Sequence, residues 1–253
     1  MAKQSGLGSE FWVGSVDLSG DTGAINTIET MRAVLDAAAI SQGAMDRMLA
    51  RRDGSLSFAA YWDPAVGASH PTLSALPRTD VQVTVAAGTP AVGSAAASLI
   101  AKQVGYAPAF GADGSLVATV AASANGVPLE WGELLTTGRQ TFASGTVNGA
   151  SIDLQSVYPL LTDTAFGAAA YLHVFALGSG TPAVTVADSA NNTDFATLAP
   201  SPLAFAPVAA GVERQVTGLA ATVRRYVRVQ VTGTYTALVC ALNFVRYTES
   251  MAV

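Results

Sequence analysis

The sequence predicts a mostly β protein, and three observations carry that prediction. Hydrophobic residues make up 50% of the 253 residues, and only 12% are charged, against roughly 25% in an average globular chain. Short apolar runs with alternating polar residues recur along the chain, and turns that contain Gly, Pro or Asn separate them. The apolar excess consists mainly of small Ala and Val residues, which suit closely packed sheets. We therefore expect a barrel or sandwich whose low-charge surface is covered by protein contacts.

The N-terminal region begins with one clear strand and then becomes ambiguous. Residues 11–19 start apolar and pass into alternation, which predicts a strand followed by a turn at residues 19–23. Residues 24–40 are Ala-rich and fit the helix and strand patterns about equally well. Residues 42–50 predict a short helix, with Ser41 available as its cap and arginines near its C-terminal end.

The clearest strand of the first half follows an Asp53-Gly54 pair, which is typical of a turn. Leu56, Phe58 and Ala60 then alternate with smaller residues and share one side of the predicted strand. Further strands are predicted at residues 80–86, 95–104, 114–124 and 129–136.

A polar stretch at residues 137–150 contains several Gly and Thr residues and suits a linker. We place a domain boundary at about Arg139. Residues 1–139 then form an N-terminal β domain with a short helix, and residues 140–253 form a C-terminal β-sandwich. Strands in the second half are predicted at residues 170–177, 183–187, 212–218, 223–232 and 237–247, with a hairpin turn at residues 178–180.

Within residues 223–231, Val227, Val229 and Val231 alternate with polar residues. Side chains two apart in a strand point to the same face of the sheet. One face of this strand is therefore predicted to lie in the core, and the other face to meet solvent or a partner.

The charge distribution argues against a protein that grips nucleic acid. The net charge is −5, with 8 basic and 12 acidic residues in residues 1–139 and 5 basic and 6 acidic residues in residues 140–253. Binding to phosphates needs clustered Lys and Arg, which neither half supplies. The N-terminus lacks the apolar run of a secretory signal, so we expect synthesis in a cytoplasm and no membrane insertion.

The residues that could carry chemistry favour structural roles. His70 precedes Pro71, which predicts an extended loop, and His173 alternates within a predicted strand. Glu130 and Glu133 are expected on a solvated face, because no aromatic-lined cleft accompanies them. The single cysteine, Cys240, lies in an apolar run and is expected to be a buried thiol. We predict no catalytic, cofactor-binding or metal-binding residue, and a protein that is not an enzyme.

The aromatic residues Trp62, Trp131 and Tyr226 could form a sugar-stacking platform. Single aromatic residues at strand ends are more often core or interface anchors. We therefore expect anchoring roles for all three side chains.

Several motifs of the first half resemble major tail proteins of long-tailed bacteriophages (siphoviruses), particularly those of actinobacterial hosts. The resemblance covers roughly residues 5–138 and rests on strand-and-turn signatures. One departure is Ala50-Arg51, where related sequences often have a Gly-Leu pair. The motifs lie at residues 16–20, 49–58, 61–64, 109–116 and 126–132.

The resemblance implies a virion protein that pairs strands with copies of itself in a hexameric ring, and rings that stack into a tail tube. It also implies contacts with other tail proteins and a lumen through which DNA passes without sequence-specific binding. The acidic balance of the first half would suit such a lumen. Residues 24–40 and 53–62 are the expected inter-subunit elements. Within the second element, the expected contact residues are Asp53, Leu56, Phe58, Tyr61 and Trp62.

The C-terminal half resembles the extra sandwich domain of such tail proteins through residues 225–233, which suggest an Ig-like, jelly-roll or carbohydrate-module-like strand. The alternative function is therefore a capsid decoration or minor tail protein whose C-terminal sandwich binds the host envelope or glycans. A glycan-cleaving enzyme would need a paired-carboxylate cleft, and the sequence singles out no such pair.

Overall fold

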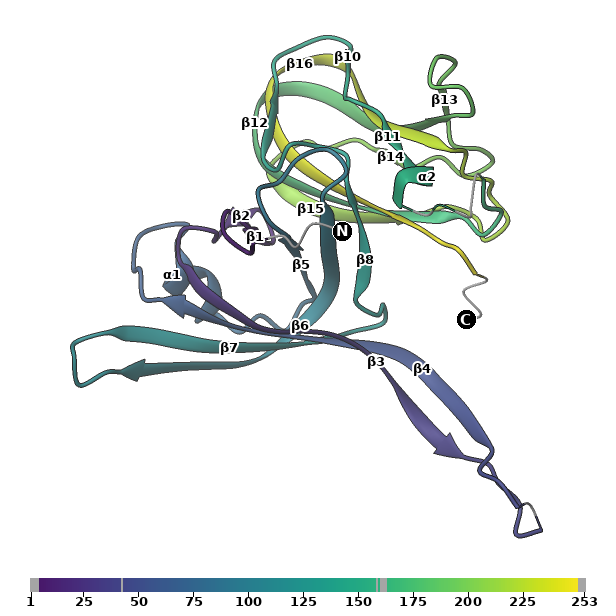
Figure 1. Cartoon of the computed structure of the whole chain (residues 1–253). Helices are drawn as coiled ribbons and strands as arrows, with labels where there is room; N and C mark the ends of the chain where they lie inside the picture. The colour runs from purple at the N-terminus through teal and green to yellow at the C-terminus, as the bar shows by residue number, and fades with distance from the viewer. Residues whose placement is uncertain (1–4, 42, 158, 160–162, 250–253) are drawn as a thin grey trace. The chain divides into compact units, whose positions relative to one another are not determined.

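The computed structural model describes residues 5–41, 43–157, 159 and 163–249. It confirms the predicted mostly β fold: these residues form strands β1 to β16 and only two short helices. The helices are α1 (Ser69–Leu73) and α2 (Leu154–Val157). Figure 1 follows the ribbon from the N-terminus to the C-terminus. No helix among the described residues is long and apolar enough to cross a membrane.

Backbone contacts divide the chain into two compact units. Unit 1 comprises Met1–Ser19, Thr84–Ser98 and Trp131–Val253, and unit 2 comprises Gly20–Val83 and Leu99–Glu130. The chain thus passes from one unit to the other four times. Residues 131–139 group with the C-terminal strands, and the domain boundary expected at Arg139 stays a prediction about independent folding.

Unit 1 is built on two long antiparallel strands, β12 (Ala168–Ser189) and β16 (Tyr226–Arg246). Their pairing runs from Ala168 opposite Arg246 to Ser189 opposite Tyr226. Short strands extend the sheet on both sides and give an arrangement consistent with a β-sandwich. The strands beside β16 are β8 (Glu130–Leu134), β9 (Gln140–Phe142), β10 (Val147–Asn148) and β11 (Ile152–Asp153). Those beside β12 are β13 (Ala196–Thr197), β14 (Ala204–Phe205) and β15 (Gly211–Val216).

The hairpin predicted at residues 178–180 is wrong, because these residues continue β12, with Ser179 opposite Thr236 and Gly180 opposite Tyr235 of β16. Glycine makes this close crossing possible. Gly180 has φ +93° and Gly233 has φ +106°, in a region that residues with a side chain rarely adopt. A Cβ on Gly180 would lie 2.2 Å from the carbonyl oxygen of Thr234. The sequence pattern therefore predicted two short strands in place of β12 and two in place of β16, because it placed turns where the backbone only bends.

The core of unit 1 lies against β12 and β16. Val227, Val229 and Val231 have no exposed surface, which confirms the predicted core face of this segment. Phe142, Phe205 and further apolar residues of the same cluster pack with them. Burial of each large apolar side chain contributes about 1.5–3 kcal/mol, so this cluster is the main source of stability in unit 1.

The N-terminal segment of unit 1 forms a small hairpin. Strands β1 (Glu10–Val13) and β2 (Val16–Asp17) pair antiparallel, with Trp12 opposite Asp17. In the order of hydrogen-bonded neighbours, β16 is followed by β8, β6, β5, β1 and β2. Trp12 has no exposed surface, so the hairpin contributes to the core of the unit. In this series, β5 comprises Val81–Ala86 and β6 comprises Ala95–Phe110.

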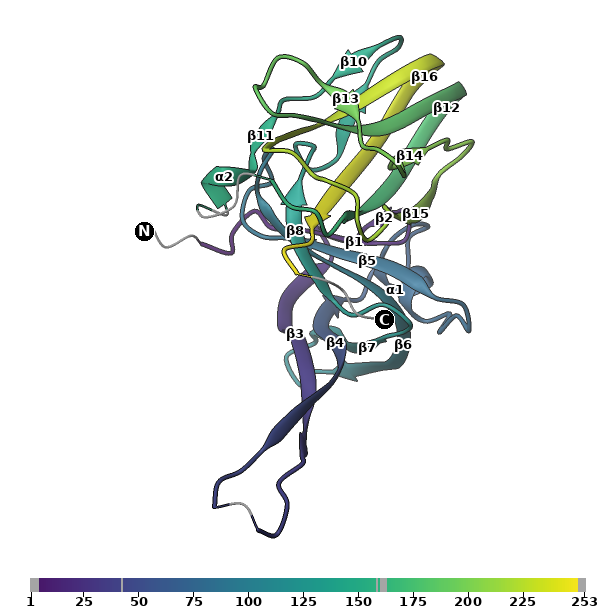
Figure 2. The ribbon, with the colours of Figure 1, turned by 90° about the vertical axis from the view of Figure 1, so that its right-hand side faces the viewer.

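Unit 2 is an antiparallel sheet in the order β3, β4, β7, β6. Its strands not yet bounded are β3 (Thr22–Asp36), β4 (Arg47–Tyr61) and β7 (Leu116–Ala124). The ambiguous residues 24–40 therefore contribute mainly a strand. Both views show the β3–β4 hairpin extending as a long ribbon (Figures 1 and 2).

Two sequence predictions in this hairpin are wrong. Residues 47–50 of the predicted helix belong to β4, where Leu49 lies opposite Val34 and Met48 opposite Leu35. Cross-strand pairing prevails here over local helix propensity. The expected turn at Asp53-Gly54 is also part of β4. Gly54 is needed for a different reason: a Cβ there would lie 2.7 Å from the backbone nitrogen of Leu129.

Candidate self-association surface

The inner part of the β3–β4 hairpin is anchored in the core of unit 2. Leu56, Phe58 and Ala60 alternate along β4 and are each at most 3% exposed. On the other side of β4, Phe58 lies opposite Val120 of β7, which is also buried. This half of the hairpin is a conventional amphipathic strand pair, with one face in the core.

Helix α1 and the segment before it fix the root of the hairpin. The backbone N–H of Ser69 donates to Asp21 at 2.8 Å, and the Ser69 hydroxyl donates to the carbonyl oxygen of Tyr61. The His70 ring stacks on Trp62 at a centroid distance of 3.7 Å, and its Nδ1 lies 2.8 Å from the Tyr106 hydroxyl. Burial raises the pKa of that Tyr106 hydroxyl. These contacts hold the base of β4 rigidly within its unit.

The outer part of the hairpin has no core face. Residues 31–36 of β3 and 47–52 of β4, with the connecting residues 37–41 and 43–46, are here called the arm. Val34 and Leu49 are paired and are 56% and 61% exposed. The next pair, Leu35 and Met48, is 53% and 60% exposed.

Successive residues of a strand point to opposite faces of the sheet. The Val34–Leu49 pair therefore lies on one face of the arm, and the Leu35–Met48 pair lies on the other. Ile40 beyond the strands is fully exposed, and Met45 is 60% exposed. Exposure of apolar side chains to water is unfavourable, and the arm exposes them on both of its faces. Burial of the arm therefore needs protein contacts on two sides.

The edge of β3 is open within its unit. Among the described strands, β3 pairs only with β4, and it is 15 residues long. Three irregularities in its register lie between Thr22 and Ala24, between Ile25 and Thr27, and between Arg32 and Val34. An edge strand of this length presents backbone donors and acceptors that can pair with a further strand.

The arm also differs in charge from the remainder of the chain. Residues 31–52 contain four arginines and two aspartates, so the arm has a net charge of +2. Because the whole chain has a net charge of −5, the remainder has a net charge of −7. Arg32 and Arg52 lie opposite each other in the register. The arm is thus electrostatically complementary to the rest of an identical chain.

The five residues expected at an inter-subunit contact fall into three environments. Asp53 is exposed next to the arm, and its carboxylate accepts the backbone N–H of Gly54 at 2.8 Å. Leu56 and Phe58 lie in the core of unit 2. Tyr61 is 57% exposed, and Trp62 is half-buried against His70. The sequence did not single out the outer apolar pairs of the arm, although their alternation with arginines was visible.

On the face of the sheet opposite Leu56 and Phe58, the residues of β4 and β7 are small and neutral, and Glu29 of β3 and Lys102 of β6 flank them. Cross-strand pairs between β4 and β7 place them side by side. These six residues carry no charge, which distinguishes this face from the acidic average of the chain. They are Ser55, Ser57 and Ala59 of β4, and Thr119, Ala121 and Ser123 of β7.

The residues considered for catalysis have structural environments. His173 lies in β12, as expected, and is completely buried. His70 does not lie in an extended loop but in α1, where Pro71 is tolerated in the first turn. Glu130 and Glu133 are 5% exposed, so the expected solvated face is wrong; β8 is covered on both sides at these positions. No group of three or more His, Cys, Asp or Glu residues among the described residues could hold a metal ion.

The aromatic side chains of unit 1 do not form a shared platform. Trp131 lies in β8, which pairs with β16 at Asn243 and Phe244. Tyr226 begins β16, and the Arg225 guanidinium lies 4.9 Å from its ring centroid. The two side chains therefore belong to opposite ends of a long strand.

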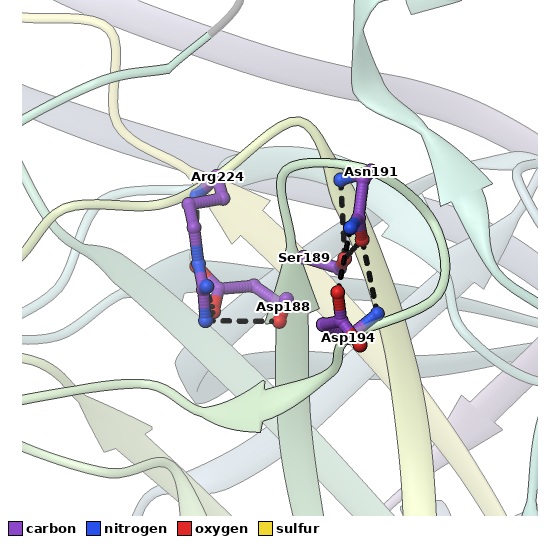
Figure 3. A network of polar contacts seen from close by, with 5 residues as sticks. All are labelled: Asp188, Ser189, Asn191, Asp194 and Arg224. Atoms are coloured by element: carbon purple, nitrogen blue, oxygen red, sulfur yellow. Dashed lines mark hydrogen bonds and ion pairs between the residues drawn. The ribbon is translucent and has the colours of Figure 1, made fainter.

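A polar network closes the end of unit 1 at which β12 terminates (Figure 3). Asp188 accepts two contacts from the Arg224 side chain, at 2.9 and 2.6 Å. Nearby, Asn191 accepts the backbone N–H groups of Thr193 and Asp194. These contacts satisfy the polar groups of the loop, which identifies the network as structural.

Comparisons with known proteins add little to this picture. No protein-family model matches the sequence, and no curated protein matches it. Among solved structures, the chain is similar to SPP1 Dit, described as a paradigm of the hub adsorption apparatus in phages that infect Gram-positive bacteria. The TM-score is 0.33 at 11% identity, over 94% of this chain and 99% of that chain. A similarity at this TM-score carries no argument about fold or function.

Proposed function

We propose that this chain is a structural subunit of a bacteriophage tail that assembles with copies of itself and catalyses no reaction. The observation that carries the proposal is the arm, whose two apolar faces are exposed in the single chain. Covering both faces requires contacts from outside the chain. The motif resemblance of residues 5–138 to major tail proteins indicates which kind of assembly supplies them.

The open edge of β3 supports assembly by strand pairing. In unit 2 the strands β3, β4, β7 and β6 alternate in direction. An identical copy that placed its β6 beside β3 would continue the antiparallel pattern, and repetition of one such contact generates a closed ring when the rotation allows it. Stacked rings of this kind, with six subunits each, are the finer form of the proposal.

The small neutral face of unit 2 suits the lumen of such a tube. Its six residues of β4 and β7 offer no cation that could bind a phosphate, and Lys102 at its margin is paired with Asp80 at 2.8 Å. DNA could therefore slide past this face with few ionic contacts. The arm has a net charge of +2 and the remainder of the chain has −7, so electrostatic attraction favours contact between the arm and a neighbouring copy.

Negative-stain electron microscopy of the purified full chain at high concentration tests the proposal. We expect rings or tubes of uniform diameter. The double variant Met48→Asp/Leu49→Asp places a charge on each face of the arm and should abolish these particles while leaving the circular dichroism of the sheet unchanged. The matched control is Val66→Asp, which changes a fully exposed apolar residue of unit 2 outside the arm and should leave assembly intact.

Dispersed monomers or trimers of the unaltered chain at every concentration would contradict the tube. That result would favour the alternative role of a decoration or minor tail protein. Equal assembly of the arm variant and the control would show that the arm is not the contact.

A further inference from the structure

A chain of four hydrogen bonds crosses the buried interior of unit 1. His173 lies at its centre and has no exposed surface. Its Nδ1 lies 2.7 Å from the carbonyl oxygen of Gly14, and its Nε2 lies 2.8 Å from Oγ1 of Thr84. Thr84 Oγ1 lies 2.8 Å from Oγ of Ser98, which accepts Nδ2 of Asn243 at 2.7 Å. The chain joins β12, β5, β6 and β16 to the turn between β1 and β2.

The proton positions along this chain follow from its two ends. A carbonyl oxygen only accepts, so Nδ1 of His173 carries the proton and donates to Gly14. Nε2 then has a free lone pair, and the Thr84 hydroxyl donates to it. Since Thr84 has used its only proton, Ser98 must donate to Thr84. Asn243 Nδ2 also lies 3.4 Å from the carbonyl oxygen of Ala96, which agrees with its role as the donor at the other end.

A second proton on His173 disrupts this order. Protonated Nε2 would face the Thr84 hydroxyl as a second donor. Reversal of Thr84 would make it donate to Ser98, whose own proton would then lose its acceptor. The alternative is movement of the ring, which breaks the bond to Gly14. Burial of the resulting positive charge without a paired anion adds a further cost.

The β1–β2 hairpin depends on the same histidine for its position. Trp12 of β1 contacts the His173 ring at a centroid distance of 5.6 Å and Phe175 at 5.8 Å. A second attachment is independent of the histidine: Arg139 pairs with Asp17 at 2.8 Å and lies 4.9 Å from the Phe175 ring centroid. These two contacts of different chemistry add to the pairing of β1 with β5 and to the burial of Trp12 in the core.

We propose that His173 is an acid-sensitive latch, which holds the β1–β2 hairpin in unit 1 while its ring is neutral and releases it when the ring is protonated. This inference goes beyond the proposed assembly and does not depend on it. Burial lowers the pKa of His173 from 6.5 to about 4, in agreement with the geometry. The neutral ring is favoured in the closed hairpin, so the closed state loses stability as the pH falls from 6.5 towards 4.

Other titratable groups on the packed elements have distinguishable effects. Burial raises the pKa of Glu10 on β1, so its protonation in acid favours the closed state, opposite in sign to His173. The segments of β5 and β6 within unit 1 contribute Thr84 and Ser98 but no titratable group. Other charged or titratable groups on these elements include Asp17 of β2, Glu133 of β8, Glu213 and Arg214 of β15, and Cys240 and Arg246 of β16.

Hydrogen exchange of the full chain between pH 7 and pH 4, corrected for intrinsic exchange, tests the latch. In peptides covering residues 10–17, the opening equilibrium should rise by roughly 80-fold from pH 6.5 to 4. Peptides from β16 serve as the internal reference. His173→Gln, which keeps a donor and an acceptor but does not titrate, should remove this pH dependence. Arg139→Gln should increase opening at every pH, and opening should still rise as the pH falls because His173 remains.

A pH-independent opening of residues 10–17, or an unchanged slope in His173→Gln, would overturn the latch. If His173→Gln does not fold, the unaltered chain provides the answer through nuclear magnetic resonance of labelled histidine, with His70→Gln for assignment. The latch requires the Nδ1–H tautomer and a neutral ring at pH 5.5. An Nε2–H tautomer, or titration near pH 6.5, would disprove it.

Discussion

Arg224 and Asp188 form a coupled pair at the end of β12. The backbone N–H of Arg224 donates to Oδ2 of Asp188 at 2.8 Å, and its Nη2 lies 2.6 Å from Oδ1. The Asp188 side chain is only 3% exposed, whereas that of Arg224 is 34% exposed. Hydrogen bonding to Asp188 raises the pKa of the Arg224 guanidinium. The loss of either partner would leave a polar group without compensation at the margin of the core.

Asp188→Asn should therefore lower the free energy of unfolding by about 1.5–3 kcal/mol, because a charged acceptor of several hydrogen bonds is lost. Urea denaturation followed by circular dichroism measures the change. The matched control is Asp194→Asn in the neighbouring exposed loop, which should cost less than about 0.5 kcal/mol. Equal effects of the two variants would contradict a stabilising role for the pair.

Gly180→Ala should destabilise the chain by about 2–4 kcal/mol, because the new Cβ would collide with the backbone of β16 at a positive φ. Gly211→Ala is the matched control: no atom lies within 4 Å of its added Cβ, and its φ is ordinary. Thermal unfolding distinguishes the two. Unchanged stability of the Gly180 variant would show that β12 can bend without glycine.

Phe58→Ala and Tyr61→Ala should separate folding from assembly. Phe58 is buried, so its loss should cost about 3–5 kcal/mol of unfolding free energy. Tyr61 is 57% exposed, and its loss should change stability by less than about 1 kcal/mol while it weakens particle formation in sedimentation. Normal assembly of Tyr61→Ala would remove this residue from the proposed contact.

Cys240 should be unreactive in the folded chain. Burial raises its pKa from 9.0 to about 12, and only the thiolate is nucleophilic. Alkylation at pH 8 should be at least about 100-fold slower than in urea. The raised pKa of Cys240 also makes the free energy of unfolding depend on pH. This free energy should be unaffected below pH 9 and should fall as the pH rises from 9 towards 12, because the thiol ionises first in the unfolded chain. Rapid labelling under native conditions would contradict this burial.

Strand positions were largely predictable because period-2 alternation reports one buried face. The valines of β16 and the alternation of Leu56 with Phe58 both followed this rule. Glycine caused the main errors. At Gly54 and Gly180 it allows a close backbone approach and not a turn, and such an approach depends on residues that are distant in the sequence.

The candidate surface was only partly predictable. Residues 24–40 and 53–62 were expected to contact other subunits; the first range includes the β3 half of the arm, and the second follows its β4 half. The segment between them was assigned to a helix because Ala, Met, Leu and Arg have high helix propensity. This segment pairs with β3 because the whole hairpin forms, and a short window of sequence cannot predict that pairing.

The four passages of the chain between the units determine when unit 1 can be completed during synthesis. Residues 1–19 emerge from the ribosome before their partners: β1 pairs with β5, and Trp12 packs on His173 and Phe175 of β12. The packing around Trp12 therefore cannot be completed until more than 150 further residues have been added. Such long-range pairing slows folding and exposes apolar segments to other nascent chains. A cell that makes many copies of the chain at once would meet this hazard at its highest concentration, so we expect expression to depend on chaperones.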